Sequence, residues 1–178
     1  MTTSGDSITP IVCIVGRGKT GKTTLLEKLI PELKRKGYRV ATIKRHSHPG
    51  LEFDVPGKDS WRHAQAGSDY VVVAGPDKLA SVRNLVHGLT LDEVAATIVG
   101  VDIILAEGYK RSAKPKIEVV RAERSSEPLC TADELLALVT DVDLSMPVPR
   151  FGLNDVQPLA DLIEARCLSG EPGRSDHG

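Results

Sequence analysis

Aromatic side chains are scarce in this chain of 178 residues, at 3% of the sequence, and charge is almost balanced, with a formal net charge of −1. Few aromatic rings argue against a surface that stacks nucleic-acid bases. A balanced charge gives no general attraction to a phosphate backbone or to an anionic membrane. The composition therefore predicts no nucleic-acid partner and no membrane partner.

Cysteine is also rare, and Cys13, Cys130 and Cys167 form no Cys-x-x-Cys pair. A disulfide scaffold normally has an even number of closely spaced cysteines, so this pattern fits a reducing compartment better. The sequence contains neither a run of 18 apolar residues nor a charged-then-apolar leader, which argues against a membrane span and an export signal. We expect a soluble, cytoplasmic protein.

The most informative segment has two glycines five residues apart, followed by Lys22 and Thr23. It lies between an apolar run at 11–15, typical of a buried parallel strand, and an amphipathic stretch that predicts a helix. Glycines in such a loop let backbone N–H groups turn toward an anionic oxygen at a helix N-terminus. Lys22 would reach the β- and γ-phosphates, and the Thr23 hydroxyl would bind Mg²⁺. The segment predicts a nucleoside triphosphate site.

Strand and helix patterns alternate along the rest of the chain. Strands are expected at 38–44, 70–74, 78–82, 101–107 and 135–139, and helices at 59–65, at 90–99 and after Asn154. Alternating polarity at 116–122 favours a further strand in an edge hairpin. We predict an α/β protein with three layers, the fold of the phosphate-loop NTPases, and a mostly parallel sheet of roughly six to eight strands.

The chain length fits one domain with its own core. The ends are rich in Ser, Gly, Asp and Pro, a composition typical of chain ends that fray. We therefore predict a flexible N-terminus at 1–9, a single nucleotide-binding domain at 10–168 and a flexible tail at 169–178.

Acidic residues stand near both ends of the apolar strand at 101–107. Ligands of an open α/β sheet bind at the carboxyl ends of its strands, and five strand residues span roughly 16 Å. Glu107 is therefore expected at the phosphate edge, and Asp102 at the opposite edge as a solvated strand opener. We predict that Glu107 binds Mg²⁺ or its water. Lys110 follows on the same rim, among cationic residues that either bind an anion or line a solvated loop.

The long polar segment 45–60 leaves the second predicted strand at this rim. A loop of this length in a compact domain is usually functional or disordered. Asp54 is a candidate for Mg²⁺ and Lys58 for a phosphate group, and the alternative is a connector that only makes a turn. The spacing of His46 and His48 suits a metal ion, but the sequence offers no evident third ligand, so exposed or phosphate-side histidines are the favoured interpretation.

The Asn-Lys-x-Asp signature of guanine recognition is absent from the sequence. Asp141 stands at the end of a predicted strand, and its carboxylate can accept hydrogen bonds from the paired N–H groups of guanine. A turn residue is the alternative for Asp141. Guanine selectivity is therefore left open by the residues alone.

These motifs resemble those of the molybdopterin-guanine dinucleotide biosynthesis protein B family over residues 10 to 165. The most distinctive match is the segment Asp54-Val55-Pro56-Gly57-Lys58-Asp59-Ser60. The other matches are the phosphate loop with Thr23-Thr24-Leu25-Leu26 and Leu29-Ile30-Pro31, Ile43-Lys44 with His46 and His48, Ala66-Gly67, Glu107-Gly108-Tyr109-Lys110, Lys116-Ile117, Thr140-Asp141-Val142, and Leu153-Asn154-Asp155-Val156 with Leu159-Ala160-Asp161. The chain departs from the pattern at Arg45, where the family usually has a further His, and in the basic Arg17-Gly18-Lys19.

The resemblance implies a homodimeric GTP-binding adapter with weak Mg²⁺-dependent GTPase activity. Its implied ligands are GTP and Mg²⁺, and its implied partners are the molybdenum cofactor guanylyltransferase and the molybdopterin cofactor. The residues we assign to GTP are Gly16, Arg17, Gly18, Lys19, Thr20, Gly21, Lys22, Thr23, Thr24, Lys44, Lys58, Lys110 and Asp141. Those assigned to Mg²⁺ are Thr23, Asp54 and Glu107, and those assigned to hydrolysis are Lys22, Asp54 and Glu107.

Two other classes of protein share this kind of loop. A small-molecule or nucleotide kinase needs a lid with several arginines, and no compact segment of that kind is evident after the loop. A metal-delivery GTPase needs a cluster of Cys and His ligands, which only His46 and His48 approach. We rank the adapter first, a kinase as the alternative, and metal delivery last.

Overall fold

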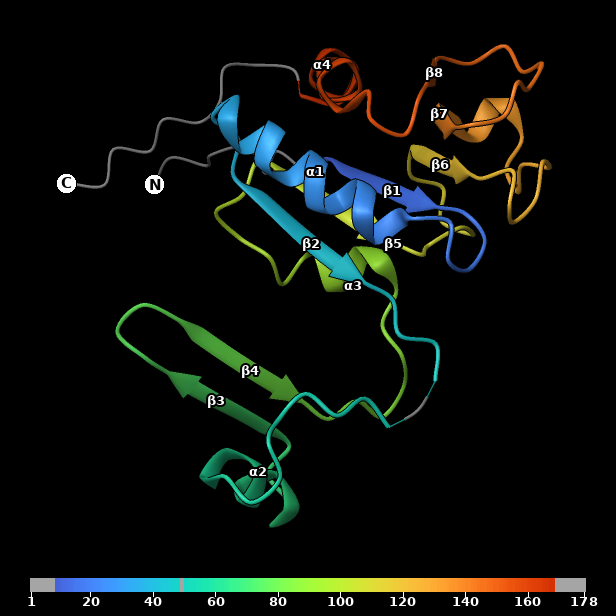
Figure 1. Cartoon of the computed structure of the whole chain (residues 1–178). Coiled ribbons are helices and arrows are strands. Elements are labelled where there is room, and N and C mark those ends of the chain that lie inside the picture. Colours follow the sequence, from blue (N-terminus) through green and yellow to red (C-terminus); the bar gives the residue numbers. More distant parts are fainter. Residues whose placement is uncertain (1–8, 49, 169–178) are drawn as a thin grey trace. The chain divides into compact units, whose positions relative to one another are not determined.

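The computed structural model of the chain describes residues 9–48 and 50–168 (Figure 1). Its elements are β1 (Ile11–Val15), α1 (Lys22–Arg35), β2 (Val40–Lys44), α2 (Asp59–Gln65), β3 (Tyr70–Ala74), β4 (Leu79–Arg83), α3 (Leu91–Ala95), β5 (Ile103–Glu107), β6 (Lys116–Val120), the 3₁₀ turn η1 (Ala132–Glu134), β7 (Leu135–Thr140), β8 (Arg150–Phe151) and α4 (Val156–Cys167). None of the helices in the described part of the chain is both long and apolar enough to cross a membrane.

The chain divides into two compact units rather than forming one. Unit 1 contains the residues up to Arg45 and from Leu91 onward, and unit 2 contains His46–Thr90. The expected domain at 10–168 thus has unit 2 inserted between β2 and α3. The flexible ends expected at 1–9 and 169–178 lie, except for residue 9, outside the described residues.

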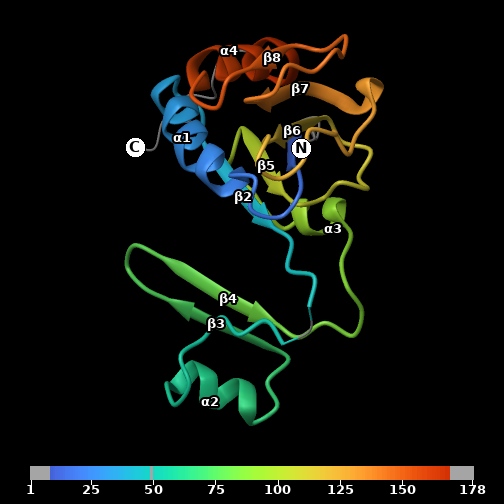
Figure 2. The same cartoon turned by 45° about the vertical axis from the view of Figure 1, so that its right-hand side comes forward.

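Unit 1 is built on a six-stranded sheet in the order β2-β5-β1-β6-β7-β8. Every neighbouring pair in it is parallel, so the predicted α/β class with a parallel central sheet is confirmed. Helices α1 and α4 pack on one face of the sheet (Figure 2). The other face is covered by the short helix α3 and by loop segments.

The core of unit 1 follows from two apolar patterns in the sequence. Leu25, Leu26, Leu29 and Leu33 recur at helical spacing along α1 and are all buried, which places one stripe of the helix on the sheet. Every residue of β1 is buried, as expected for a parallel strand that is covered on both faces. Buried β1 therefore carries the chain directly into the glycine-containing loop at its carboxyl end.

The prediction of an edge hairpin at 116–122 is wrong, because β6 lies inside the sheet, parallel to both β1 and β7. The charged residues that produced the alternating pattern are buried with partners. Lys116 is 2% exposed and its Nζ lies 3.1 Å from Glu134 Oε1. Glu118 is 1% exposed and accepts hydrogen bonds from the N–H groups of Leu129 and Cys130, at 2.7 and 3.0 Å. Paired charges thus occupy positions that usually hold apolar side chains.

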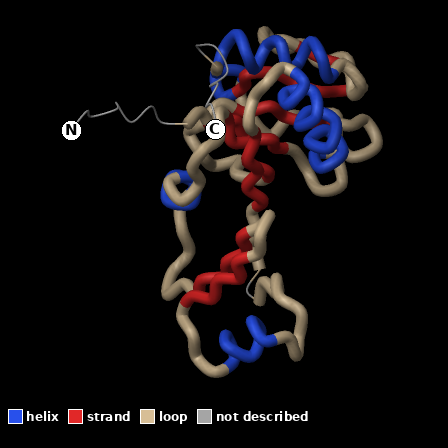
Figure 3. Tube along the Cα trace, turned by 90° about the vertical axis from the view of Figure 1, so that its left-hand side faces the viewer, coloured by secondary structure: helices blue, strands red, loops and turns tan. Residues whose placement is uncertain are grey.

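In unit 2, β3 and β4 pair antiparallel with each other, from Tyr70 opposite Arg83 to Ala74 opposite Leu79 (Figure 3). Both strands were predicted, but as part of the central sheet, and this placement is wrong. The two strands form a separate sheet, and α2 precedes them in the chain. Among the residues of unit 2 that the structure describes, none is buried.

Two helix ends also differ from the predictions. Helix α3 ends at Ala95 instead of near 99, because the N–H groups of Thr97 and Ile98 bond to carbonyls three residues back, and the Thr97 hydroxyl donates to Val94 O. Helix α4 has Asp155 at its N-cap. The expected cap, Asn154, instead accepts a hydrogen bond from Lys28 Nζ at 2.7 Å.

Candidate nucleotide site

At two positions, the loop between β1 and α1 has backbone angles that suit only glycine. Gly16 has a φ of 141°, and a Cβ there would lie 2.5 Å from Val119 O. Gly21, immediately before α1, has a φ of 91°. Both angles lie in a region that residues with a Cβ rarely adopt. The two glycines of the motif therefore fix the start and the end of the loop.

Thr20 and Lys22 hold the loop together from inside. Thr20 is 2% exposed, and its hydroxyl donates to Arg17 O at 3.0 Å. The ammonium of Lys22 donates to Gly16 O at 3.1 Å and to Arg17 O at 2.7 Å. Burial lowers the pKa of Lys22, an effect that the carboxylate of Glu107 opposes. A cation thus lies over the loop, next to the amide groups that begin α1.

Glu107 is the last residue of β5 and is 8% exposed. Its Oε2 accepts a hydrogen bond from the Thr23 hydroxyl at 3.3 Å, and its Oε1 accepts one from Lys44 Nζ at 2.5 Å. Lys44 ends β2 and is in register with Glu107. The carboxyl ends of β2 and β5 and the first turn of α1 therefore meet at this acid, as strand polarity predicted.

The donor set at this edge fits Mg²⁺ that is brought in by a triphosphate. Mg²⁺ prefers oxygen ligands, keeps several waters and is usually held by one or two protein groups together with substrate phosphates. The Thr23 hydroxyl and the Glu107 carboxylate are such groups. The described residues contain no group of three or more His, Cys, Asp and Glu that could hold a metal by themselves, so the site does not resemble a protein-only cage.

Asp102 lies at the other end of the same strand region and is not the solvated strand opener that we expected. Its carboxylate accepts hydrogen bonds from the Arg39 backbone N–H at 2.6 Å and from the Arg39 side chain at 2.8 and 3.1 Å. The Arg39 side chain lowers the pKa of Asp102. Asp102 thus joins the starts of β2 and β5, and sequence inspection missed this pairing because the two residues are far apart in the chain.

Asp141 follows β7, and both of its carboxylate oxygens have partners within the chain. Oδ1 accepts from the Ala122 N–H at 2.8 Å, and Oδ2 accepts from Arg121 Nε at 3.0 Å. Arg121 was missed in the sequence, because 116–122 was interpreted as an edge hairpin. If 116–120 is interpreted as an internal parallel strand, the next residue, Arg121, is expected at the edge of the sheet where the strands have their carboxyl ends.

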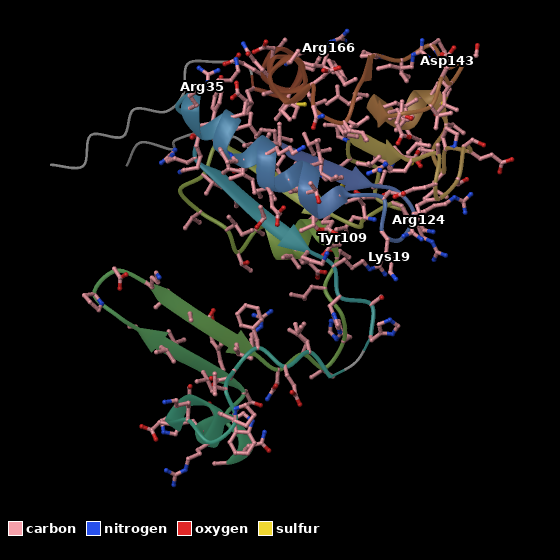
Figure 4. All side chains as sticks on the ribbon, viewed as in Figure 1. Lys19, Arg35, Tyr109, Arg124, Asp143 and Arg166 are labelled. Atoms are coloured by element: carbon pink, nitrogen blue, oxygen red, sulfur yellow. The ribbon has the colours of Figure 1, made fainter. Side chains whose placement is uncertain are left out.

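Other expected residues lie around the same rim. The loop contains Lys19, which has a left-handed φ of 63°, and the exposed residues Arg17 and Gly18. Thr24 lies at the start of α1 and Lys110 follows β5, and both are exposed. Figure 4 shows Lys19, Tyr109 and Arg124 at the carboxyl end of the sheet, with Arg35 toward its opposite end. No contact within the chain tests the roles assigned to these residues, and those assignments stay predictions.

Asp54, Lys58 and the two histidines belong to unit 2. Asp54 Oδ1 accepts a hydrogen bond from the next residue's N–H at 2.8 Å, and Lys58 precedes α2 as its N-cap. The rings of His46 and His48 meet edge to face, with centroids 6.0 Å apart. These contacts lie within unit 2, and the roles proposed for these residues at the nucleotide remain predictions.

A parallel sheet, a glycine-bounded loop after its buried strand β1, and a lysine and threonine at the start of α1 together define a phosphate-loop α/β protein. The sequence model of one family, described as molybdopterin guanine dinucleotide synthesis protein B, matches residues 11–141. The match spans most of the chain, including the loop, Glu107 and Asp141. The chain belongs to this family.

Individual relatives agree with that assignment. The chain is 39% identical over 158 residues to the molybdopterin-guanine dinucleotide biosynthesis adapter protein of Haemophilus influenzae, covering 87% of this chain and 88% of that protein. It is 34% identical over 166 residues to the protein of that name from Escherichia coli, covering 90% and 94% of the two chains. A crystal structure of molybdopterin-guanine biosynthesis protein B matches with a TM-score of 0.68 and 30% identity, covering 87% of this chain and 98% of that one.

Proposed function

We propose that this protein is a GTP-binding adapter that assists the attachment of GMP to the molybdopterin cofactor, which forms molybdopterin-guanine dinucleotide. The observation that carries the proposal is the meeting of Lys22, Thr23 and Glu107 at the ends of β1 and β5. Family membership supports the pathway. The geometry supports a triphosphate as the ligand, because it combines a cation, the backbone amides at the start of α1 and an acid suited to Mg²⁺.

Each residue has a defined task in this proposal. The loop amides and Lys22 bind the phosphates, while Thr23 and Glu107 hold Mg²⁺, which supplies positive charge next to them when bound. Glu107 already accepts hydrogen bonds from Lys44 and Thr23, so its carboxylate is better suited to hold a metal than to take a proton from water. We therefore propose a weak, Mg²⁺-dependent GTPase activity.

A homodimer is part of the proposal, and the hairpin of unit 2 supports it. Val72 and Leu79 are 50% and 73% exposed, and the pairing of Val72 with Ser81 and of Ala74 with Leu79 places them on the same face of the hairpin. A two-stranded hairpin with an uncovered apolar surface is only marginally stable in water, and a second copy of the chain would cover it. We expect Val72→Asp to give monomers in light scattering after size exclusion and the parent protein to give dimers. A monomeric parent protein at micromolar concentration would contradict the homodimer.

The molybdenum cofactor guanylyltransferase and the molybdopterin cofactor are the proposed partners. In unit 2, Asp54 is partly exposed and Lys58 is exposed, and Lys58 offers a cation to a cofactor phosphate. The three thiols are free, which suits a reducing compartment such as the cytoplasm. We expect Asp54→Asn and Lys58→Ala to leave the midpoint of thermal unfolding nearly unchanged and to lower the rate of dinucleotide formation.

The test is a reconstituted reaction containing purified transferase, molybdopterin cofactor, Mg²⁺ and GTP, in which the rate of dinucleotide formation is measured. We expect the chain to raise this rate, and Lys22→Ala to remove most of the increase. A parallel titration of GTP and ATP with and without Mg²⁺ measures the nucleotide preference. The adapter proposal fails if the rate is the same with the chain, with the Lys22→Ala variant and with no addition.

A further inference from the structure

Two polar residues stand at the carboxyl ends of β6 and β7, on the side of β1 away from Glu107. Arg121 Nε donates to Asp141 Oδ2 at 3.0 Å, and the Ala122 N–H donates to Asp141 Oδ1 at 2.8 Å. Arg121 Nη2 also lies 3.5 Å from Glu123 Oε1. These contacts fix the direction of the Asp141 carboxylate, whose side chain is still 35% exposed.

The same arginine lies beside the phosphate loop. Its Nη1 is 3.9 Å from the position that a Cβ on Gly21 would occupy. One guanidinium group thus spans from the loop residue before α1 to the carboxylate after β7. Because the guanidinium is planar and its donors are rigidly spaced, Arg121 fixes the orientation of the Asp141 carboxylate while it lies beside the loop.

The order of the strands decides which part of a nucleotide could reach this pair. Glu107 ends β5 and Asp141 follows β7, so they lie on opposite sides of the loop that follows β1. Adjacent strands are about 4.8 Å apart, so β7 lies roughly 10 Å from β1. With its metal-bearing phosphates at Thr23 and Glu107, a nucleotide would extend its sugar and base toward β6 and β7.

We propose that Arg121 is a positioning residue of a guanine subsite, in which it holds Asp141 so that the carboxylate meets the N1–H and N2–H groups of the base. The inference rests on the proposed GTP binding and assigns its base selectivity. Each oxygen of Asp141 has a further lone pair beyond its bond within the chain. Adenine presents no such pair of adjacent donors, so the arrangement favours guanine. The N–H of Ala122, with the charge of Arg121, lowers the pKa of Asp141, which keeps the acceptor ionised near neutral pH.

The experiment compares the dissociation constants of GTP, ATP and XTP for the parent chain, four single variants and one double variant by calorimetry. In Arg121→Ala we expect GTP to bind about tenfold more weakly, the loss of one charge-assisted hydrogen bond, while ATP changes by less than threefold. Arg121→Lys, which keeps the charge but not the planar fork, should behave in the same way. Arg124→Ala removes the same charge from the same loop and is the matched control, expected to change neither constant.

The fourth variant, Asp141→Asn, keeps the inference testable if Arg121→Ala fails to fold. Because the amide donates where the carboxylate accepted, we expect this variant to lose affinity for GTP and to gain affinity for XTP, which carries a carbonyl in place of the 2-amino group. Combining Arg121→Ala with Asp141→Asn should weaken GTP binding no further than Asp141→Asn alone, because Arg121 acts through Asp141.

Three outcomes would overturn the inference. Equal losses for GTP and ATP in Arg121→Ala would place Arg121 at the phosphates, and unchanged constants would leave it without a part in binding. Additive effects in the double variant would show that Arg121 does not act through Asp141. A parent chain that binds GTP and ATP equally well would instead remove the proposed GTP preference itself, so the two failures are distinguishable.

Discussion

The strands of the two units differ in how much of their surface they bury. In unit 1, β1, β5 and β6 are buried along their whole length, including two charged residues of β6. In unit 2, β4 is exposed at every position and β3 at all but Val71. Both units use β-branched and apolar residues in their strands, so composition alone does not separate them.

The difference shows where each unit obtains its stability. Full burial of a Val, Leu or Ile side chain contributes about 1.5–3 kcal/mol, and unit 1 has many such residues. The apolar side chains of unit 2 remain largely in contact with water, so they contribute little to folding within one chain. Their exposure is understandable if another surface covers them, as the proposed homodimer requires.

The largest expected effect compares one apolar truncation in each unit. Ile104 is 0% exposed in β5 and Leu79 is 73% exposed in β4. We expect Ile104→Ala to lower the free energy of unfolding by about 2–5 kcal/mol, and Leu79→Ala to change that of the monomer by less than about 0.5 kcal/mol. Urea unfolding, measured at a concentration where the protein is monomeric, tests both. Similar losses for the two variants would mean that unit 2 has a core of its own.

The next prediction assigns phosphate binding to unit 1. Removing the ammonium of Lys22 should weaken GTP binding by roughly 10- to 150-fold, because a charge-assisted hydrogen bond contributes about 1.5–3 kcal/mol. Lys58→Ala, the matched change in unit 2, should weaken it less. Calorimetric titration gives both constants, and circular dichroism checks the fold. If Lys58→Ala is the more damaging change, the phosphate site includes unit 2.

A third prediction compares the acidic residues at the two ends of β5, within unit 1. Glu107→Gln should reduce the Mg²⁺-dependent gain in GTP affinity by about tenfold, since Glu107 lies next to Thr23. Asp102→Asn should leave that gain unchanged and lower stability, because Asp102 is paired with Arg39. Titrations with and without Mg²⁺ and thermal unfolding separate the two effects. A larger loss of the Mg²⁺-dependent gain in Asp102→Asn would place the metal at the opposite edge.

The smallest expected effect concerns pH and the buried polar residues of unit 1. Burial, with the nearby charge of Glu118, raises the pKa of Cys130 to about 12 from 9.0. The unfolded chain therefore loses the thiol proton near pH 9 while the folded chain keeps it, so stability falls as pH rises above 9. We expect the parent protein to lose about 1 kcal/mol more than Cys130→Ala between pH 9 and 10. An equal loss would mean that Cys130 titrates normally in the fold.

The parts of the fold that local patterns determine could be predicted from the sequence. The strand at β1, the loop, the helix α1 and the end of β5 at Glu107 follow from apolar runs, glycine spacing and strand polarity. The position of β6 could not be predicted, because its two charges are satisfied by partners 11 to 18 residues later. The separate hairpin was missed for a similar reason, since a strand pattern does not indicate the sheet that the strand joins.

For the candidate site, the residue types indicated which edge of the sheet would bind phosphate and metal. The structure adds the neighbouring side chains that bond to these residues. The pairing of Lys44 with Glu107 depends on the register of β2 and β5, which no single segment contains. The link from Arg121 to Asp141 likewise depends on β6 and β7 being adjacent. Pairings of this kind join distant parts of the chain and therefore become visible only once the sheet is known.

The sheet order also has a consequence for synthesis on the ribosome. Ile11 of β1 pairs with Ile104 of β5, so the central strand waits for its partners until unit 2 has been made. The hairpin of unit 2 needs only contacts between neighbouring residues and can form first, whereas parallel pairing between distant segments is slow. A nascent chain therefore carries an unpaired apolar β1 together with an exposed apolar hairpin. We expect this stage to be prone to aggregation and to benefit most from chaperones.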